Sequence, residues 1–176
     1  MKTDYKVIIG VVLLTLGIVV SGAWLTSKRG AEQTAKLSKS MMGEKMPDQG
    51  GGHVAEGEKH PAYNSNPPTS GPHWVGVAGA GIKDEPVPDE LVLHSMEHGA
   101  AVVWYREGLE QAEIDEITEA FASADGKKIM LARKALDVPV ALTSWGYLLK
   151  LDMVDGVKIK EFIETNNDRA PEKAPI

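Results

Sequence analysis

The chain has 176 residues, of which 43% are hydrophobic and 25% are charged, and its formal net charge is −6. This length allows one domain with a short extra segment, and the composition excludes a wholly disordered chain. The negative charge argues against a nucleic-acid partner, because such a protein presents a basic face and none is visible. The sequence contains no cysteine, which excludes disulfides, cysteine-ligated zinc, iron–sulfur clusters and thiol catalysis.

The N-terminal region predicts a short tail at residues 1–6 and a transmembrane signal anchor at residues 7–25. Residues 7–25 carry no charge, and a helix of that length spans about 28 Å, close to the roughly 30 Å hydrocarbon core of a bilayer. The alternative is a cleavable signal peptide, with Ser21, Gly22 and Ala23 as the cleavage site. The apolar run continues through Trp24 and Leu25, which favours an uncleaved anchor.

The orientation of this anchor follows from two opposing signals. Basic residues are at least as dense after the segment as before it, and the positive-inside rule therefore leaves the orientation open. A short basic N-terminus before an apolar run is the usual export signal. We therefore expect the following domain to be membrane-anchored on the extracytoplasmic side.

Residues 26–52 predict a flexible tether, because they are rich in Ser, Lys, Gln and Gly and show little apolar periodicity. Three methionines in this stretch, Met41, Met42 and Met46, could capture Cu(I), although an ordinary stalk is the simpler interpretation. The globular domain is expected at residues 53–168. It starts with a Pro- and Gly-rich region through which no regular helix can run, and which presents His73 at the end of a stiff loop.

The rest of the domain alternates between strand and helix patterns. We expect a buried strand at residues 100–105, an amphipathic helix at 110–124, a short strand at 128–132, one strand broken at Gly146 or a hairpin at 138–151, and a helix at 155–166 capped by Asp155. Residues 169–176 contain two prolines and predict a C-terminal tail. The fold class is therefore α+β, with a small, largely antiparallel sheet and two covering helices.

The histidines carry the strongest functional signal, because all five lie within residues 53–98. His94 and His98 are four residues apart, a spacing that puts both rings on one face of either a helix or a strand. The segment is best interpreted as a short helix that starts near Pro88 and stops at Gly99.

Three interpretations of this histidine pair stay open. The first is a transition-metal site formed by His94, His98 and His73, with Met96 or Glu97 as a further ligand. Copper is favoured over zinc there, because imidazole binds both ions and thioether sulfur suits Cu(I).

The second interpretation is a zinc peptidase with an H-x-x-E-H motif, in which Glu97 would be the general base. The third is a non-catalytic protein-interaction module with structural histidines and a docking surface on the proline-rich loop. We predict no catalytic residue, because no complete catalytic constellation is visible. The sequence does not identify a protein partner.

Four motifs occur in order along the chain: YNSNPPTSGPH at residues 63–73, DEPVP at 84–88, HSMEHG at 94–99 and ALTSWG at 141–146. In these motifs the chain resembles a bacterial membrane-anchored family called domain of unknown function 3105, over roughly residues 53–166. The resemblance implies that the proline-rich loop and the histidine pair belong to one domain, and it implies no activity. It also implies an apolar residue at the position of Met96. The side chain of Met96 would then serve packing, and the metal hypothesis would depend on His73, His94 and His98.

Overall fold

The computed structural model describes residues 5–176, which divide into two compact units, one ending at Ser40 and the other spanning Met41–Ile176. Helix α1, Tyr5–Ser38, makes up most of the first unit. Its segment Ile8–Ala31 is long and apolar enough to cross a membrane, a property shared by membrane anchors and signal sequences. The tail expected at residues 1–6 lies outside the described residues except for its last two positions, which begin α1.

The second unit contains a six-stranded mixed sheet in the described part of the chain, with the strand order β1-β6-β5-β3-β4-β2. The strands are β1 (Glu44–Lys45), β2 (Gly81–Lys83), β3 (Ala101–Arg106), β4 (Lys128–Arg133), β5 (Val140–Ser144) and β6 (Tyr147–Leu151). Neighbours from β1 to β3 pair antiparallel, whereas β3, β4 and β2 run parallel. This confirms the predicted α+β fold. Of the two structures expected for residues 138–151, a broken strand or a hairpin, the chain forms the hairpin.

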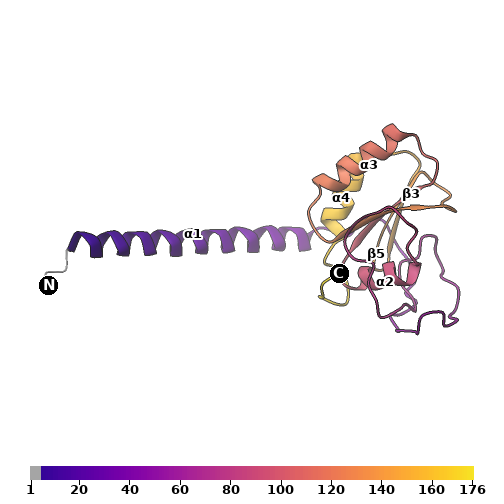
Figure 1. Cartoon of the computed structure of the whole chain (residues 1–176), viewed down its shortest axis with the longest axis horizontal. Helices are drawn as coiled ribbons and strands as arrows, with labels where there is room; N and C mark the ends of the chain where they lie inside the picture. The colour runs from indigo at the N-terminus through magenta and orange to yellow at the C-terminus, as the bar shows by residue number, and fades with distance from the viewer. Residues whose placement is uncertain (1–4) are drawn as a thin grey trace. The chain divides into compact units, whose positions relative to one another are not determined.

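Three helices cover the two faces of this sheet (Figure 1): α2 (Asp89–Glu97), α3 (Gln111–Ser123) and α4 (Gly156–Asn166). Helices α3 and α4 pack against each other and lie on the same face. The residues of strand β3 divide between the two faces of the sheet. Ala101 and Val103 join the core under α3 and α4, whereas Val102 and Trp104 join the core under α2. The two long helices therefore leave the opposite face to α2 and the long loop region.

The ends of the helices are explained by residues that lie close to them in the sequence. Glu110 and Glu113 form a reciprocal capping box at the start of α3, and the Asp155 side chain accepts a hydrogen bond from the Lys158 amide at the start of α4. Gly99 has a φ of +97° just after α2, a conformation that glycine adopts without steric cost. As predicted, the chain therefore turns sharply from α2 into β3.

The residues expected to form a tether have two different structures. Helix α1 continues to Ser38, and residues from Met41 onward belong to the second unit. There β1 pairs with β6, and the side-chain amide of Asn166 binds the backbone of Met42 through bonds of 2.9 and 3.0 Å. Met42 and Met46 pack against the two hydrophobic cores. Strand β1 is too short to show a periodic pattern, so the sequence did not reveal this attachment.

The C-terminal residues 168–176 contain neither helix nor strand in the structure, yet their backbone is tied to the domain. The Asp168 amide donates to Gly99 O at 2.8 Å, and the Glu172 amide donates to Glu97 O at 3.1 Å. Lys127 Nζ donates to Ala174 O at 2.9 Å. We call this segment the C-terminal strap, because it runs along the end of α2 where Glu97 and His98 lie.

Candidate metal centre

Pairing between two loop segments brings His53 beside His73. The segments are held by three backbone hydrogen bonds of 2.8 to 3.1 Å: Gly71 N to Gly50 O, His73 N to Gly52 O and Val54 N to His73 O. The two histidines form a parallel β-bridge, and their ring centroids are 5.0 Å apart. Two histidines twenty positions apart in the sequence therefore lie side by side.

Helix α2 adds His94 and Glu97 to this pair. The ring centroid of His94 lies 4.7 Å from that of His53 and 5.0 Å from that of His73. One potential ligand atom from each of His53, His73, His94 and Glu97 lies within 4.8 Å of the others. We call these four residues the inner cluster. Its members His73, His94 and Glu97 are 0%, 5% and 6% exposed, whereas His53 is exposed.

Backbone carbonyls orient two of the rings. His73 Nδ1 lies 2.9 Å from Gly71 O, and His94 Nδ1 lies 3.1 Å from Gly76 O. A carbonyl oxygen can only accept, so the proton of each neutral ring is on Nδ1 and Nε2 carries the lone pair. This arrangement is typical of metal-binding histidines, whose second nitrogen donates to a carbonyl or a carboxylate.

A close contact between a ring nitrogen and a carboxylate oxygen, without hydrogen-bond geometry, lies at the centre of the cluster. His73 Nε2 is 3.0 Å from Glu97 Oε2, yet both atoms are buried and neither makes a hydrogen bond within the described residues. Buried polar atoms in native proteins are normally paired, because leaving them unpaired costs free energy. A cation between the two atoms would satisfy both, since ligands of a tetrahedral ion with bonds of 2.0–2.1 Å are about 3.3 Å apart.

The electrostatic environment favours the metal-binding form of His94. Burial lowers its pKa, the neighbouring rings of His98, His73 and His53 lower it further, and the hydrogen bond to Gly76 opposes these effects. The ring is therefore kept neutral, and a neutral imidazole is the form that coordinates a metal.

His98 lies next to the inner cluster, with its ring 4.4 Å from that of His94 in an edge-on arrangement. The four-residue spacing therefore does bring the two rings together. The nitrogens of His98, however, face the C-terminal strap: Nδ1 lies 2.7 Å from Pro175 O, and Nε2 lies 3.3 Å from Glu172 Oε2.

Met96 lies in the core beneath the cluster and is 0% exposed. Its sulfur accepts a hydrogen bond of 3.2 Å from Thr143 Oγ1, and the same hydroxyl accepts one of 2.8 Å from Trp104 Nε1. The thioether is thus part of a buried polar chain that joins α2 to β5 and β3.

These residues lie in a region that matches a protein family. The family described as Protein of unknown function (DUF3105) matches residues 53–175. The chain belongs to this family. Comparisons with curated proteins and with solved structures gave no significant match. The whole inner cluster, His98 and Glu172 lie within the matched region, so the candidate metal centre is part of this DUF3105 domain.

Within the DUF3105 domain, His73, His94 and Glu97 were candidate ligands from the sequence alone, and His53 was not. His53 follows a Gly-rich stretch, which gave no reason to expect a fixed ring. One signal was present: Gly51-Gly52-His53 and Gly71-Pro72-His73 share a Gly-x-His pattern, and these are the two segments that pair. His60 lies outside the cluster, where Nε2 contacts Glu90 at 3.1 Å and Nδ1 contacts Pro61 O at 2.9 Å.

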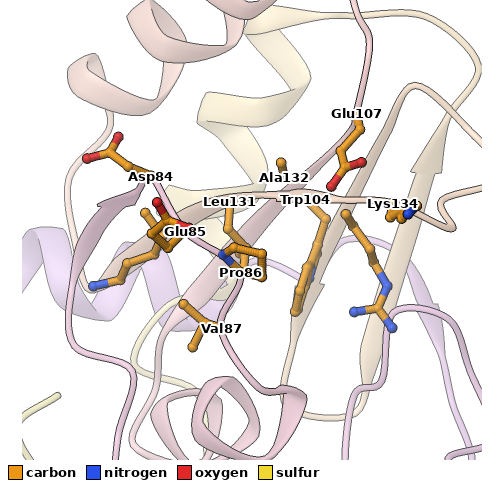
Figure 2. A pocket seen from close by; sticks show the side chains of 11 residues that line it. Asp84, Glu85, Pro86, Val87, Trp104, Glu107, Leu131, Ala132 and Lys134 are labelled. Atoms are coloured by element: carbon orange, nitrogen blue, oxygen red, sulfur yellow. The ribbon is translucent and has the colours of Figure 1, made fainter.

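A groove of about 360 Å³ opens elsewhere in the domain, at the carboxyl ends of β2, β3 and β4 (Figure 2). Trp104 and Leu131 form part of its wall, and both acidic and basic side chains surround it. Arg133, one of its cations, is already bound to Asp89 through two hydrogen bonds of 2.6 and 2.9 Å. The groove therefore offers mixed charge, and we assign it no ligand.

Proposed function

We propose that this DUF3105 protein binds one transition-metal ion through His53, His73, His94 and Glu97, in a domain that α1 anchors to the extracytoplasmic side of a membrane. One observation carries the metal assignment: the buried atoms His73 Nε2 and Glu97 Oε2 lie 3.0 Å apart without a hydrogen bond. An imidazole nitrogen and a carboxylate oxygen without hydrogen bonds can both serve as ligands once a cation is present.

The donor set favours a divalent ion. Three imidazoles and one carboxylate suit Cu(II) and Zn(II), and the usual order of affinities places Cu(II) above Zn(II). Cu(I) would gain from a thioether ligand, but the sulfur of Met96 is engaged by Thr143 inside the core. We therefore favour copper over zinc, in its divalent state.

The same donor set favours binding over catalysis. Four protein ligands fill a tetrahedral shell, whereas a catalytic zinc keeps one position open for water. The peptidase hypothesis needs His98 as a ligand and Glu97 as a free base. The cluster instead groups Glu97 with the ligand atoms. Storage or delivery of the ion is therefore the activity that the site supports best.

Three features support the cellular placement. The segment Ile8–Ala31 is apolar and long enough for a bilayer, it follows a short basic N-terminus, and the chain has no cysteine, which suits an oxidising compartment. A reporter fused after Ile176, active on only one side of the membrane, tests this orientation. Activity on the cytoplasmic side alone would contradict it.

The metal assignment is tested by competition titration of Cu(II) and Zn(II) on the full chain in detergent. Wild type should bind one ion at the inner cluster. The double variant His73→Ala with His94→Ala should weaken this binding by more than about 100-fold. Loss of a residue that only supports a ligand typically costs about 10- to 100-fold. His60→Ala is the matched control, because it removes a histidine outside the cluster. Equal binding by wild type and the double variant would leave the interaction-module hypothesis.

A further inference from the structure

A second pair of potential ligand atoms lies beside the inner cluster. His98 Nε2 is 3.3 Å from Glu172 Oε2, the separation of about 3.3 Å expected for two ligands of one tetrahedral ion. His98 comes from the end of α2 and Glu172 from the C-terminal strap. We call these two residues the outer pair.

The outer pair is held in place by the backbone around it. His98 Nδ1 lies 2.7 Å from Pro175 O, so this nitrogen carries the proton of the neutral ring and Nε2 faces the carboxylate. The Glu172 amide donates to the carbonyl oxygen of Glu97 at 3.1 Å. The strap is therefore bonded directly to the residue that supplies the inner carboxylate.

The outer pair is also more open to solvent than the inner ligands that it adjoins. The side chains of His98 and Glu172 are 11% and 52% exposed, whereas His73 is fully buried. At the same time, the His98 ring lies 4.4 Å from that of His94. The outer pair therefore contacts both solvent and one ring of the inner cluster.

We propose that His98 and Glu172 form a second, outer metal position, through which a divalent transition-metal ion exchanges between solvent and the inner cluster. This inference rests on the proposed function, because the outer position serves an ion held by the inner ligands. With only two protein ligands, the outer position completes its shell with water and holds the ion more weakly than four ligands do.

Stepwise transfer explains why such a position would speed exchange. An ion that left the inner cluster directly would have to lose buried ligands while leaving the Glu97 carboxylate buried and uncompensated, which is costly. Once its ring turns from the strap toward the adjoining His94, His98 can bind the ion before an inner ligand leaves, since zinc sites can expand to five ligands. The exposed His53 offers a competing route into the cluster, and the experiment must separate the two.

The test uses the full chain in detergent, loaded with one equivalent of Zn(II), and measures the release of the ion to excess EDTA by stopped flow. His98→Ala and Glu172→Gln should each slow release by about tenfold or more, with the equilibrium affinity of the inner site changed by less than about threefold. His60→Ala is the matched control, because His60 has the same carbonyl and carboxylate contacts away from the cluster. Its release rate should equal that of wild type.

Each other outcome has a distinct meaning. Unchanged release rates in both variants overturn the outer position and leave exchange to the route through His53. A large loss of equilibrium affinity in His98→Ala makes His98 an inner ligand and also overturns it. A wild-type chain that binds no Zn(II) or Cu(II) refutes the proposed function itself. If circular dichroism shows that His98→Ala does not fold, the exposed Glu172→Gln decides alone.

Discussion

The backbone of Gly51 lies so close to the carboxylate of Glu97 that a β-carbon at position 51 would overlap Glu97 Oε1. Glu97 is thereby confined between Gly51 on one side and His73, whose Nε2 lies 3.0 Å from the other carboxylate oxygen. The Gly-rich stretch before His53 thus has a specific role, because only glycine allows this close approach.

Gly51→Ala should weaken metal binding by about 10- to 100-fold, the usual effect of disturbing a residue that supports a ligand. The added methyl group must displace Glu97 from its place beside His73. Gly52→Ala is the matched control, since a β-carbon there meets no atom within 4 Å, and it should bind as wild type does. Competition titration with Cu(II) measures both, and equal affinities would show that Glu97 need not keep this position for the ion to bind.

Met96→Leu should leave the Cu(II) affinity unchanged and lower the free energy of unfolding by less than about 1.5 kcal/mol, as volume-conserving core changes do. The reason is that Met96 is fully buried and its sulfur contacts Thr143. Titration and urea unfolding provide the two readouts. A large loss of copper binding would instead make the thioether a ligand.

Much of the fold was predictable from the sequence because its signals are local. The capping residue Asp155 and the apolar face of residues 155–166 predict α4, and the structure has that helix at Gly156–Asn166. The edge strands β1 and β2 contain two and three residues. Such strands form because a neighbouring strand offers hydrogen-bonding groups, and their own sequence contains no pattern.

The site was predictable only in part, for the same reason. The spacing of His94 and His98 is local, and the structure does place their rings together. The pairing of His53 with His73 depends on backbone hydrogen bonds between distant loops. The contact of His98 with Glu172 depends on the path of the C-terminal strap, which a tail with two prolines does not reveal. Long-range contacts thus decide which residues form the inner cluster and which form the outer pair.

His60 provides a pH-dependent contribution to stability away from the metal centre. The hydrogen bond with Pro61 O raises its pKa in the folded state, and the hydrogen bond and charge of Glu90 add to this effect. A raised folded-state pKa stabilises the protein fully below the unfolded value of about 6.5, and this contribution disappears as pH rises through the folded pKa.

Wild type should therefore be more stable than His60→Gln at pH 5.5, by on the order of 0.5 kcal/mol for a pair near the surface. The difference should shrink by pH 8.5. Urea unfolding in the presence of a chelator measures both proteins without a contribution from bound metal. Glu90→Gln should reduce the same pH dependence, and a difference that grows with pH would reverse the assigned sign.

Arg133 joins α2 to the proline-rich loop, and these two elements carry three of the four inner ligands. Its guanidinium binds Asp89 at the start of α2 through Nη1 and Nη2, and Nε donates to Asn66 Oδ1 of the proline-rich loop at 2.7 Å. The group also lies 4.9 Å from the ring centroid of Trp104. A planar, forked cation is needed for all of these contacts, and lysine cannot reproduce them.

Arg133→Lys should therefore lower the free energy of unfolding by about 1–2 kcal/mol, which corresponds to a fall in Tm of about 3–6 °C for a domain of this size. Lys150→Ala is the control, because the exposed pair of Lys150 and Asp137 should contribute less than about 1 kcal/mol. Thermal unfolding of the metal-free protein compares the two variants. If both lower Tm equally, Arg133 acts as an ordinary surface charge, and the positions of α2 and the proline-rich loop must depend on the packing around Trp104.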